Sequence, residues 1–194
     1  MLSVMLDTSV LWPSLQRDFL LSMAALGLYR PLWSEAILEE LHEHELLKLV
    51  RRGASPSEAA RRSAHLLAQM RTHFDDAIVS DWEHLEGSFG LPDVDDEHVV
   101  AAAVVGGARI IVTNNLVDFP VDKMPTHIEV HDATSFAVLA AAIDTHDAIL
   151  ALNEIAKRHL NPPESSIDIL DALVTIYGMV SLGELLRPLL AAEA

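Results

Sequence analysis

Short apolar runs alternate with longer stretches of helical periodicity along residues 1–132. The first apolar run, residues 2–6, stops at Asp7 and predicts a buried strand. Continuous apolar runs of this length are typical of strands covered on both faces, as in a parallel sheet. Further strands are predicted at residues 30–33, 77–79, 109–113 and 128–131.

Helices are predicted between these strands. Ser34 and Ser55 stand at N-cap positions, and Gly53 and the pair Gly106-Gly107 follow helix ends. The predicted helices cover residues 15–29, 34–52, 55–74 and 95–105. Alternation of this kind predicts an α/β fold with a largely parallel sheet. We expect residues 1–132 to form this unit and residues 133–194 to form a C-terminal helical extension, broken at Asn161-Pro162-Pro163.

The composition of the chain excludes several classes of function. The net charge of −16, from 29 acids and 13 bases, argues against a protein that binds nucleic acid through a basic face. Cysteine is absent, which excludes disulfides and thiolate metal sites and favours a cytoplasmic location. No apolar run reaches the roughly 18 residues of a membrane span, and the first residues do not resemble a signal peptide, so no membrane association is expected.

The positions of the acids suggest a site. In an open parallel sheet the functional crevice lies at the carboxyl ends of the strands. Asp7 directly follows the first strand, and Asp118 lies shortly after residues 109–113. Glu40 lies at the edge of the stripe formed by the apolar residues of its helix, whereas Glu39 points nearly opposite, to solvent. Glu40 is therefore the better candidate to reach the crevice.

The segment 92–98 is the densest group of acids. An acidic helix start accounts for Asp93 and Asp95, which are N-cap candidates. Asp96 is different, because it shares the face of three apolar residues, Val99, Val100 and Ala103. A carboxylate on a buried face needs a partner or a cation. Carboxylates without cysteine favour a hard ion, Mg²⁺ or Mn²⁺, and hence metal-assisted phosphoryl chemistry.

Other interpretations are weaker. The sequence His42-Glu43-His44-Glu45 invites a zinc site, but histidines two residues apart do not share a helix face, so a charged, exposed helix end is expected. Asp7-Thr8-Ser9 resembles aspartyl-phosphate enzymes only superficially, since Ser9 replaces their second Asp. Trp12 and Trp33 are predicted to be core residues rather than RNA-stacking platforms.

Four blocks together resemble the PIN-domain family. They are LDTSV at 6–10, SEAILEEL at 34–41, PDVDDEHVVAAA at 92–103 and IIVTNNLVDFP at 110–120. The third is the most specific, being similar to a bacterial branch with PDPDDxH before an alanine-rich helix. The resemblance implies a Rossmann-like α/β/α sandwich with an acidic pocket for Mg²⁺ or Mn²⁺ that cleaves RNA. It also implies, for many members, a VapC-like toxin paired with an antitoxin, and a homodimer.

Carried over by position, the catalytic and metal-binding acids are Asp7, Glu40 and Asp96. The fourth position stays open between Asn115, where the family motif falls, and Asp118, which would supply the charge. The residues expected to support the site are Thr8, Ser9, Asp93, Asp95, His98, Thr113 and Asn115. The alternatives are a PIN-like module that binds RNA or protein without catalysis, and a housekeeping RNA-processing nuclease.

Overall fold

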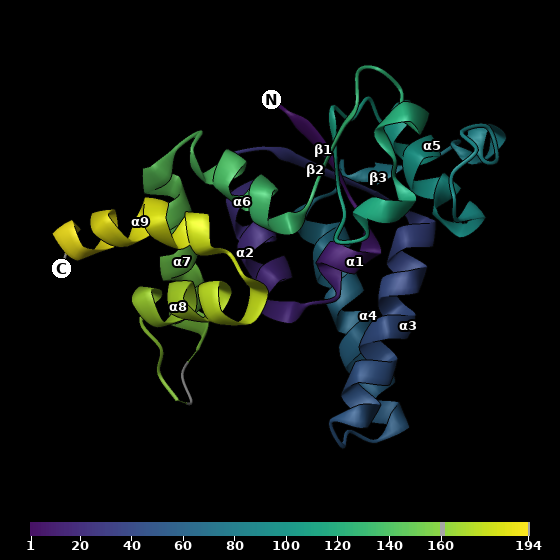
Figure 1. The fold of residues 1–194 in the computed structure, drawn as a ribbon. Helices are drawn as coiled ribbons and strands as arrows, with labels where there is room; N and C mark the ends of the chain where they lie inside the picture. Colours follow the sequence, from purple (N-terminus) through teal and green to yellow (C-terminus); the bar gives the residue numbers. More distant parts are fainter. Residues whose placement is uncertain (160–161, 194) are drawn as a thin grey trace.

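A computed structural model describes residues 1–159 and 162–193. Its centre is a five-stranded, all-parallel sheet in the order β3-β2-β1-β4-β5. The strands are β1 (Ser3–Leu6), β2 (Arg30–Ser34), β3 (Ile78–Val79), β4 (Ile110–Val112) and β5 (Glu129–His131). All five coincide with predicted apolar runs. The predicted α/β/α sandwich with C-terminal helices is confirmed (Figure 1).

Helices surround this sheet. They are α1 (Thr8–Leu11), α2 (Ser14–Ala25), α3 (Glu35–Arg51), α4 (Pro56–His73), α5 (Glu97–Val105), α6 (Ala133–Ala141), α7 (Thr145–Arg158), α8 (Ser166–Tyr177) and α9 (Val180–Glu193). Helix α5 packs across β1, β2 and β4, whereas α3 and α4 pair as a hairpin that projects away from the sheet (Figure 1). The order of the strands places the switch in winding direction between β1 and β4, where a crevice is expected.

The predicted helix caps are present. The Ser34 hydroxyl accepts a hydrogen bond from the Ile37 N–H, and the Ser55 hydroxyl accepts one from the Glu58 N–H. Gly107 has a φ of +66°, a left-handed conformation that glycine adopts without strain, and it follows α5 directly after Gly106. A Cβ on Gly106 would lie 2.7 Å from Val79 Cγ2, so a larger residue does not fit between α5 and the sheet.

Two element boundaries differ from the prediction. The helix expected from Asp95 begins at Glu97, because residues Val94–Asp96 form a 3-10 turn (η2) that the Asp93 carboxylate caps at the Asp95 N–H (3.0 Å). The helix expected over residues 15–29 ends at Ala25, since Gly27 turns the chain with a φ of +86°. The Asp96 side chain makes no capping hydrogen bond at the start of α5, so its carboxylate is not used as a helix cap.

The C-terminal helices continue the core of the sheet rather than standing apart from it. Helix α6 contacts β5 and α2, and α7 packs along α2. The predicted break separates α7 from α8, although Asn161 itself lies outside the described residues. Over the described parts of the chain, no single helix combines the length and the apolar character of a membrane span; α6 and α7 meet the criterion only together, across a 117° bend.

Candidate active site

The loops that follow β1 and β4 are tied together around Asp7. The Thr113 hydroxyl donates to Asp7 Oδ2 (2.7 Å), and the Ser9 hydroxyl donates to the same oxygen (2.6 Å). The backbone N–H of Asn114 in turn donates to Ser9 Oγ (2.8 Å). Asp7 is only 5% exposed, so these two hydroxyl donors fix a nearly buried carboxylate at the carboxyl end of the sheet.

A second group of carboxylates converges from the turns η2 and η3 (Leu116–Asp118). One oxygen from each of Asp93, Asp96 and Asp118 lies within 4.8 Å of the other two. Asp93 is exposed, whereas Asp96 and Asp118 are half-buried. Asp93 therefore does more than cap η2: it also brings a third oxygen to a group that can hold a metal ion.

The electrostatics of Asp96 connect this group to Asp7. Burial, together with the negative charges of Asp7, Asp93 and Asp118, raises the pKa of the Asp96 carboxyl to about 6. A carboxyl with a raised pKa in such surroundings carries unrelieved repulsion, which a bound cation would remove. The three carboxylates and Asp7 thus form one acidic site, built from the ends of β1 and β4 and the start of α5.

Asp118, not Asn115, brings a carboxylate to the fourth position. The Asn115 side-chain amide donates to Asp118 Oδ2, and its backbone N–H donates to Thr113 Oγ1 (3.0 Å). Asn115 therefore holds Asp118 against the loop that Thr113 anchors. The sequence left this position open between the two residues. In the structure Asp118 carries the carboxylate and Asn115 holds it in place.

Glu40 lies beside the acidic group rather than within it. Its Oε2 accepts from the Thr8 hydroxyl (2.6 Å), and its Oε1 lies 3.0 Å from His98 Nε2. Burial raises the pKa of Glu40, but the hydrogen bonds from His98 and Thr8, with the charges of His98 and His44, outweigh it, so the net shift is downward. Glu39 is exposed on the opposite side of α3, as its position in the helix predicted.

His98 is buried between Glu40 and the aspartates. Burial lowers the pKa of its imidazole, but the hydrogen bond and charge of Glu40 and the charges of Asp7 and Asp96 outweigh burial and raise it. Its Nδ1 has no hydrogen-bond partner among the described residues. The raised pKa favours the protonated form of the ring, whose positive charge would lie next to these carboxylates.

Two further acids, Asp95 and Glu97, flank Asp96 in the sequence. Asp95 is exposed and contributes only its backbone N–H to Asp93, so its carboxylate stays outside the group. Glu97, which sequence reasoning passed over, is 2% exposed and accepts from the N–H groups of Phe89 (3.0 Å) and Leu91 (2.9 Å). The sequence did hold a signal for the burial of Glu97. The rest of α5 is nearly all apolar, so an acid at its start is expected to be buried with the helix. Glu97 fixes the loop before η2 and hence the aspartates on it.

Comparison with known families decides the identity of this fold. A family model described as "PIN domain" matches residues 3–117, more than half of the chain. The chain belongs to the PIN-domain family. The matched residues include β1, β2 and β4 and the whole acidic site except Asp118. Comparisons with curated proteins and with solved structures found no significant match.

PIN domains are typically metal-dependent nucleases that use divalent ions, and the donor set of this PIN domain fits such an ion. Its ligands are all carboxylate oxygens, which hard ions such as Mg²⁺ and Mn²⁺ prefer. The convergence of three carboxylate oxygens within 4.8 Å, two of them from half-buried side chains, is the observation that calls for a cation. Asp93, Asp96 and Asp118 would hold it, with Asp7 adjacent.

Two expectations about this PIN domain were wrong. Trp12, predicted to be core, is 42% exposed, whereas Trp33 is fully buried as expected. Glu45, predicted to lie on an exposed helix end, is 6% exposed in the middle of α3. It is buried because Arg17 Nη1 reaches its Oε1 (2.9 Å) from α2, a partner distant in sequence.

Proposed function

We propose that this PIN domain is an endoribonuclease that hydrolyses RNA phosphodiester bonds with Mg²⁺ or Mn²⁺ bound at Asp93, Asp96 and Asp118. One observation carries the proposal: three carboxylates from two separate turns converge within 4.8 Å beside the nearly buried Asp7. A divalent ion bound there would polarise a phosphodiester and generate a hydroxide nucleophile from water.

The residues of the chain would divide the remaining work. Thr113 and Ser9 hold Asp7 in one orientation, and Asn115 holds Asp118. The His98–Glu40 pair lies along one side of the site, where a protonated imidazole would face the substrate phosphate with a positive charge. Preorganised carboxylates of this kind need no rearrangement when an ion binds, which favours catalysis over transient ion binding.

A non-catalytic binding module is the competing proposal. Bringing carboxylates together and burying one of them costs free energy, because each loses water and repels the others. A module that only binds RNA gains nothing from this repulsion, and the net charge of −16 opposes binding without a metal. The buried Asp7 and the raised pKa of Asp96, which follows from burial, therefore favour the enzyme.

The direct test compares two neighbouring carboxylates. The purified protein should cleave RNA with Mn²⁺ or Mg²⁺ and stop on addition of EDTA. Asp96→Asn should lower kcat roughly 100-fold or more, because losing a metal ligand removes several kcal/mol of charge stabilisation. Asp95→Asn is the matched control: the residue is adjacent and exposed but outside the group, and it should retain activity. Full cleavage by Asp96→Asn would refute the assignment.

We further propose that the enzyme is a VapC-like toxin, homodimeric and cytoplasmic, held inactive by an antitoxin encoded beside it. The block PDVDDEHVVAAA at residues 92–103 supports this, because it is similar to the bacterial PDPDDxH branch. Induced expression should then arrest growth, and co-expression of a small neighbouring open reading frame should restore it. Growth without arrest would favour a housekeeping RNA-processing nuclease with the same chemistry.

A further inference from the structure

Trp12 is more exposed to solvent than the hydrophobic effect alone would leave a tryptophan. Its side chain is 42% exposed, whereas Trp33 and Trp82 are 0% and 8% exposed. The indole lies against the imidazole of His44, with ring centroids 6.2 Å apart and an angle of 23° between the planes. One ring of this stacked pair belongs to the end of α1 and the other to α3. The pair presents an aromatic surface to solvent.

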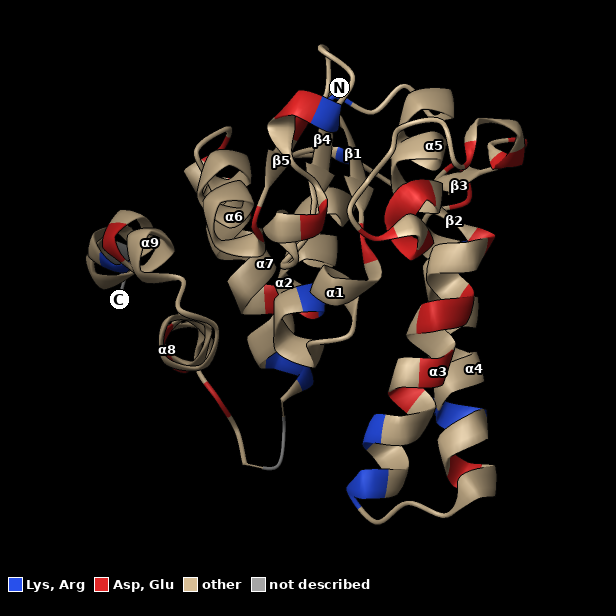
Figure 2. Ribbon diagram, turned by 45° about the vertical axis from the view of Figure 1, so that its right-hand side comes forward, with Lys and Arg blue, Asp and Glu red and all other residues tan. Residues whose placement is uncertain are grey.

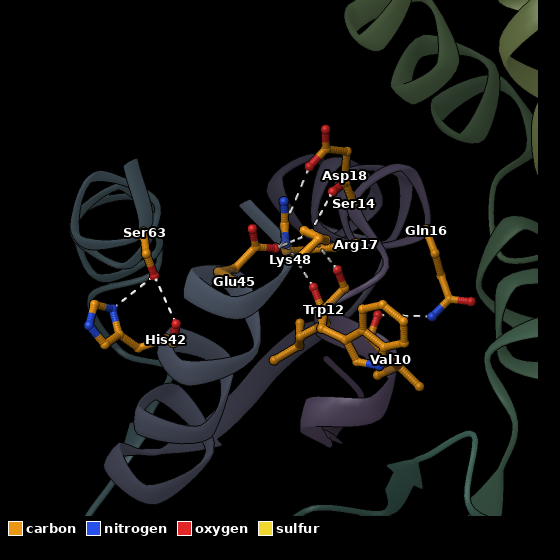
Figure 3. A network of polar contacts seen from close by, with 11 residues as sticks. Val10, Trp12, Ser14, Gln16, Arg17, Asp18, His42, Glu45, Lys48 and Ser63 are labelled. Carbon is orange, nitrogen blue, oxygen red and sulfur yellow. Dashed lines mark hydrogen bonds and ion pairs between the residues drawn. The ribbon is translucent and has the colours of Figure 1, made fainter. Parts of the chain in front are cut away.

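A buried ion cluster fixes the backbone beneath this surface. Lys48 Nζ donates to the Trp12 carbonyl (2.9 Å), and Arg17 Nη1 donates to the Leu11 carbonyl (2.9 Å). Both cations also bind Glu45 Oε1, and the three side chains are 12%, 8% and 7% exposed (Figure 3). The cluster holds the main chain of Trp12 and makes no hydrogen bond to its ring. The ring itself is therefore free to serve a ligand.

The aromatic pair lies one helical turn from Thr8 and Glu40, which border the acidic site, along two separate elements. Helix α1 begins at Thr8, whose hydroxyl binds Glu40, and reaches Trp12 four residues later. Helix α3 carries Glu40 and then His44, also four residues on. At 1.5 Å per residue each path is about 6 Å long. A nucleotide one step beyond the two that flank the cleaved bond would meet this pair.

The same stripe of α3 ends in positive charge. Glu40, His44 and Arg51 fall within about 40° of one another on a helix of 3.6 residues per turn. Arg51 and Arg52 are exposed, and neither forms an ion pair within the described ranges. Of the 13 basic residues in the chain, four lie at this end of the hairpin: Arg51, Arg52, Arg61 and Arg62. Figure 2 shows acidic residues on α3 nearer the sheet and basic residues toward its far end, with an acidic segment near the start of α4.

We infer that Trp12 and His44 form a stacking subsite for a base of single-stranded RNA whose backbone continues along α3 toward Arg51 and Arg52. The inference rests on the proposed ribonuclease function and adds a specificity device to it. Aromatic rings bind unpaired bases through their faces, which a duplex hides in its own stack, and arginines bind phosphates. A protein segment is the competing occupant, but the aromatic pair followed by Arg51 on the same stripe, with Arg52 next to it, matches the bases and phosphates of an extended polyanion.

The first experiment measures binding with Ca²⁺ in place of Mg²⁺ or Mn²⁺, so that a cation offsets the charge of the acids while cleavage is suppressed. Fluorescence anisotropy follows labelled oligouridine, and quenching of tryptophan fluorescence reports on Trp12, the most exposed of the three tryptophans. Trp12→Ala should weaken binding roughly 10-fold, about 1.4 kcal/mol. Trp12→Phe, which keeps a ring, should recover most of the loss. Ile176→Ala on α8, also exposed, should bind like the wild type.

Three results of the binding measurements alone would overturn the subsite. They are equal affinity of Trp12→Ala and wild type, an equal loss on duplex RNA of the same length, and a loss that Trp12→Phe does not recover. Unchanged RNA binding with weakened self-association, measured by light scattering, would assign the surface to a second copy of the chain instead and would also overturn it. A melting temperature measured for each variant excludes unfolding as the cause.

A separate measurement tests whether the RNA backbone runs along α3 toward Arg51 and Arg52. Arg51→Gln should weaken oligouridine binding and reduce the slope of log affinity against log salt by about one. Arg109→Gln is the matched control, because Arg109 is also exposed and without an ion pair among the described residues, but lies before β4 at the opposite end of the sheet from the site. Equal changes in both variants would indicate a diffuse charge effect and contradict the path along α3.

Cleavage separates this inference from the proposed function. With Mn²⁺, Trp12→Ala should lower kcat/KM for oligouridine roughly 10-fold and leave that for a uridine dinucleotide unchanged, since the dinucleotide does not need the subsite. Absence of cleavage by the wild type, with Trp12-dependent binding intact, would refute the nuclease and keep the subsite. Equal losses on both substrates would place Trp12 in the general integrity of the site and refute the subsite.

Discussion

The α/β unit of residues 1–132 and the helices α6–α9 that follow it share one hydrophobic core but bury different kinds of side chain. Among the residues whose burial the structure describes, every buried polar or charged side chain lies in the α/β unit. They are Asp7, Thr8, Gln16, Arg17, Ser34, Glu45, Ser63, Glu97, His98 and Thr113. Helices α6–α9 bury alanine, leucine, isoleucine and phenylalanine, and the turn between α8 and α9 buries Met179.

This difference separates packing from chemistry. An apolar contact stabilises the fold at any position where it fits, whereas a buried polar group costs free energy unless it finds a partner. The α/β unit meets this cost at several places, among them Asp7, Glu45 beneath the surface of Trp12, Glu97 before α5 and Ser63 beside His42. The C-terminal helices cover α2 and β5 and show no comparable polar arrangement within their described residues.

The largest expected effect tests the buried ion cluster. Glu45→Ala leaves Arg17 and Lys48 without their shared carboxylate, and losing one partner of a buried pair costs about 3–5 kcal/mol. Urea unfolding should show this loss. Glu154→Ala in α7, whose partner Lys157 is exposed, should cost less than about 1 kcal/mol. Similar losses in the two variants would remove the distinction between the regions.

A core substitution in α7 should cost stability without touching the site. Leu152 is fully buried, and Leu152→Ala should lower the free energy of unfolding by about 2–5 kcal/mol through lost contacts and a cavity. Below its unfolding transition the variant should bind Mn²⁺ with unchanged affinity, measured by calorimetry. A folded Leu152→Ala protein with weakened Mn²⁺ binding would show that the C-terminal helices help to shape the acidic site.

Metal binding should stabilise the protein through the α/β unit, where the acidic site lies. At about 100 times its Kd, Mn²⁺ should add about 2.7 kcal/mol of stability. For a chain of this length the melting temperature should rise by roughly 5–10 °C, and EDTA should reverse the rise. Asp96→Asn should abolish the shift, whereas Asp95→Asn should keep it. A full shift in Asp96→Asn would move the ion to another set of ligands.

How far sequence predicted these regions depends on the range of the interactions. Period and capping are local, so the apolar runs located all five strands and Ser34 and Ser55 marked the starts of α3 and α4. The same local pattern placed Asp7 at the end of β1 and separated Glu40 from Glu39. These predictions needed only the direction of each side chain within one element.

The features that sequence missed arise from contacts between elements. Asp93 meets Asp118 because two 3-10 turns, not one continuous helix, carry the acids. Glu45 is buried because Arg17 approaches from α2, which no pattern within α3 reveals. Trp12 is exposed, and its carbonyl accepts a hydrogen bond from Lys48 on α3. In each case the partner lies on another element, and composition gives no information about it.

The smallest expected effect sharpens the place of Glu40 within the α/β unit. Both oxygens of Glu40 are already in contact, one with Thr8 and one with His98, so we expect it to position His98 rather than to bind the ion. Glu40→Gln should then lower the cleavage rate roughly 10- to 100-fold, the usual cost of losing an outer-shell partner, and keep the Mn²⁺-dependent rise in melting temperature. Glu39→Gln, exposed on the same helix, should change neither quantity. A lost melting-temperature shift in Glu40→Gln would make Glu40 a ligand, as the resemblance to the family implied, and equal rates in the two variants would take Glu40 out of the site.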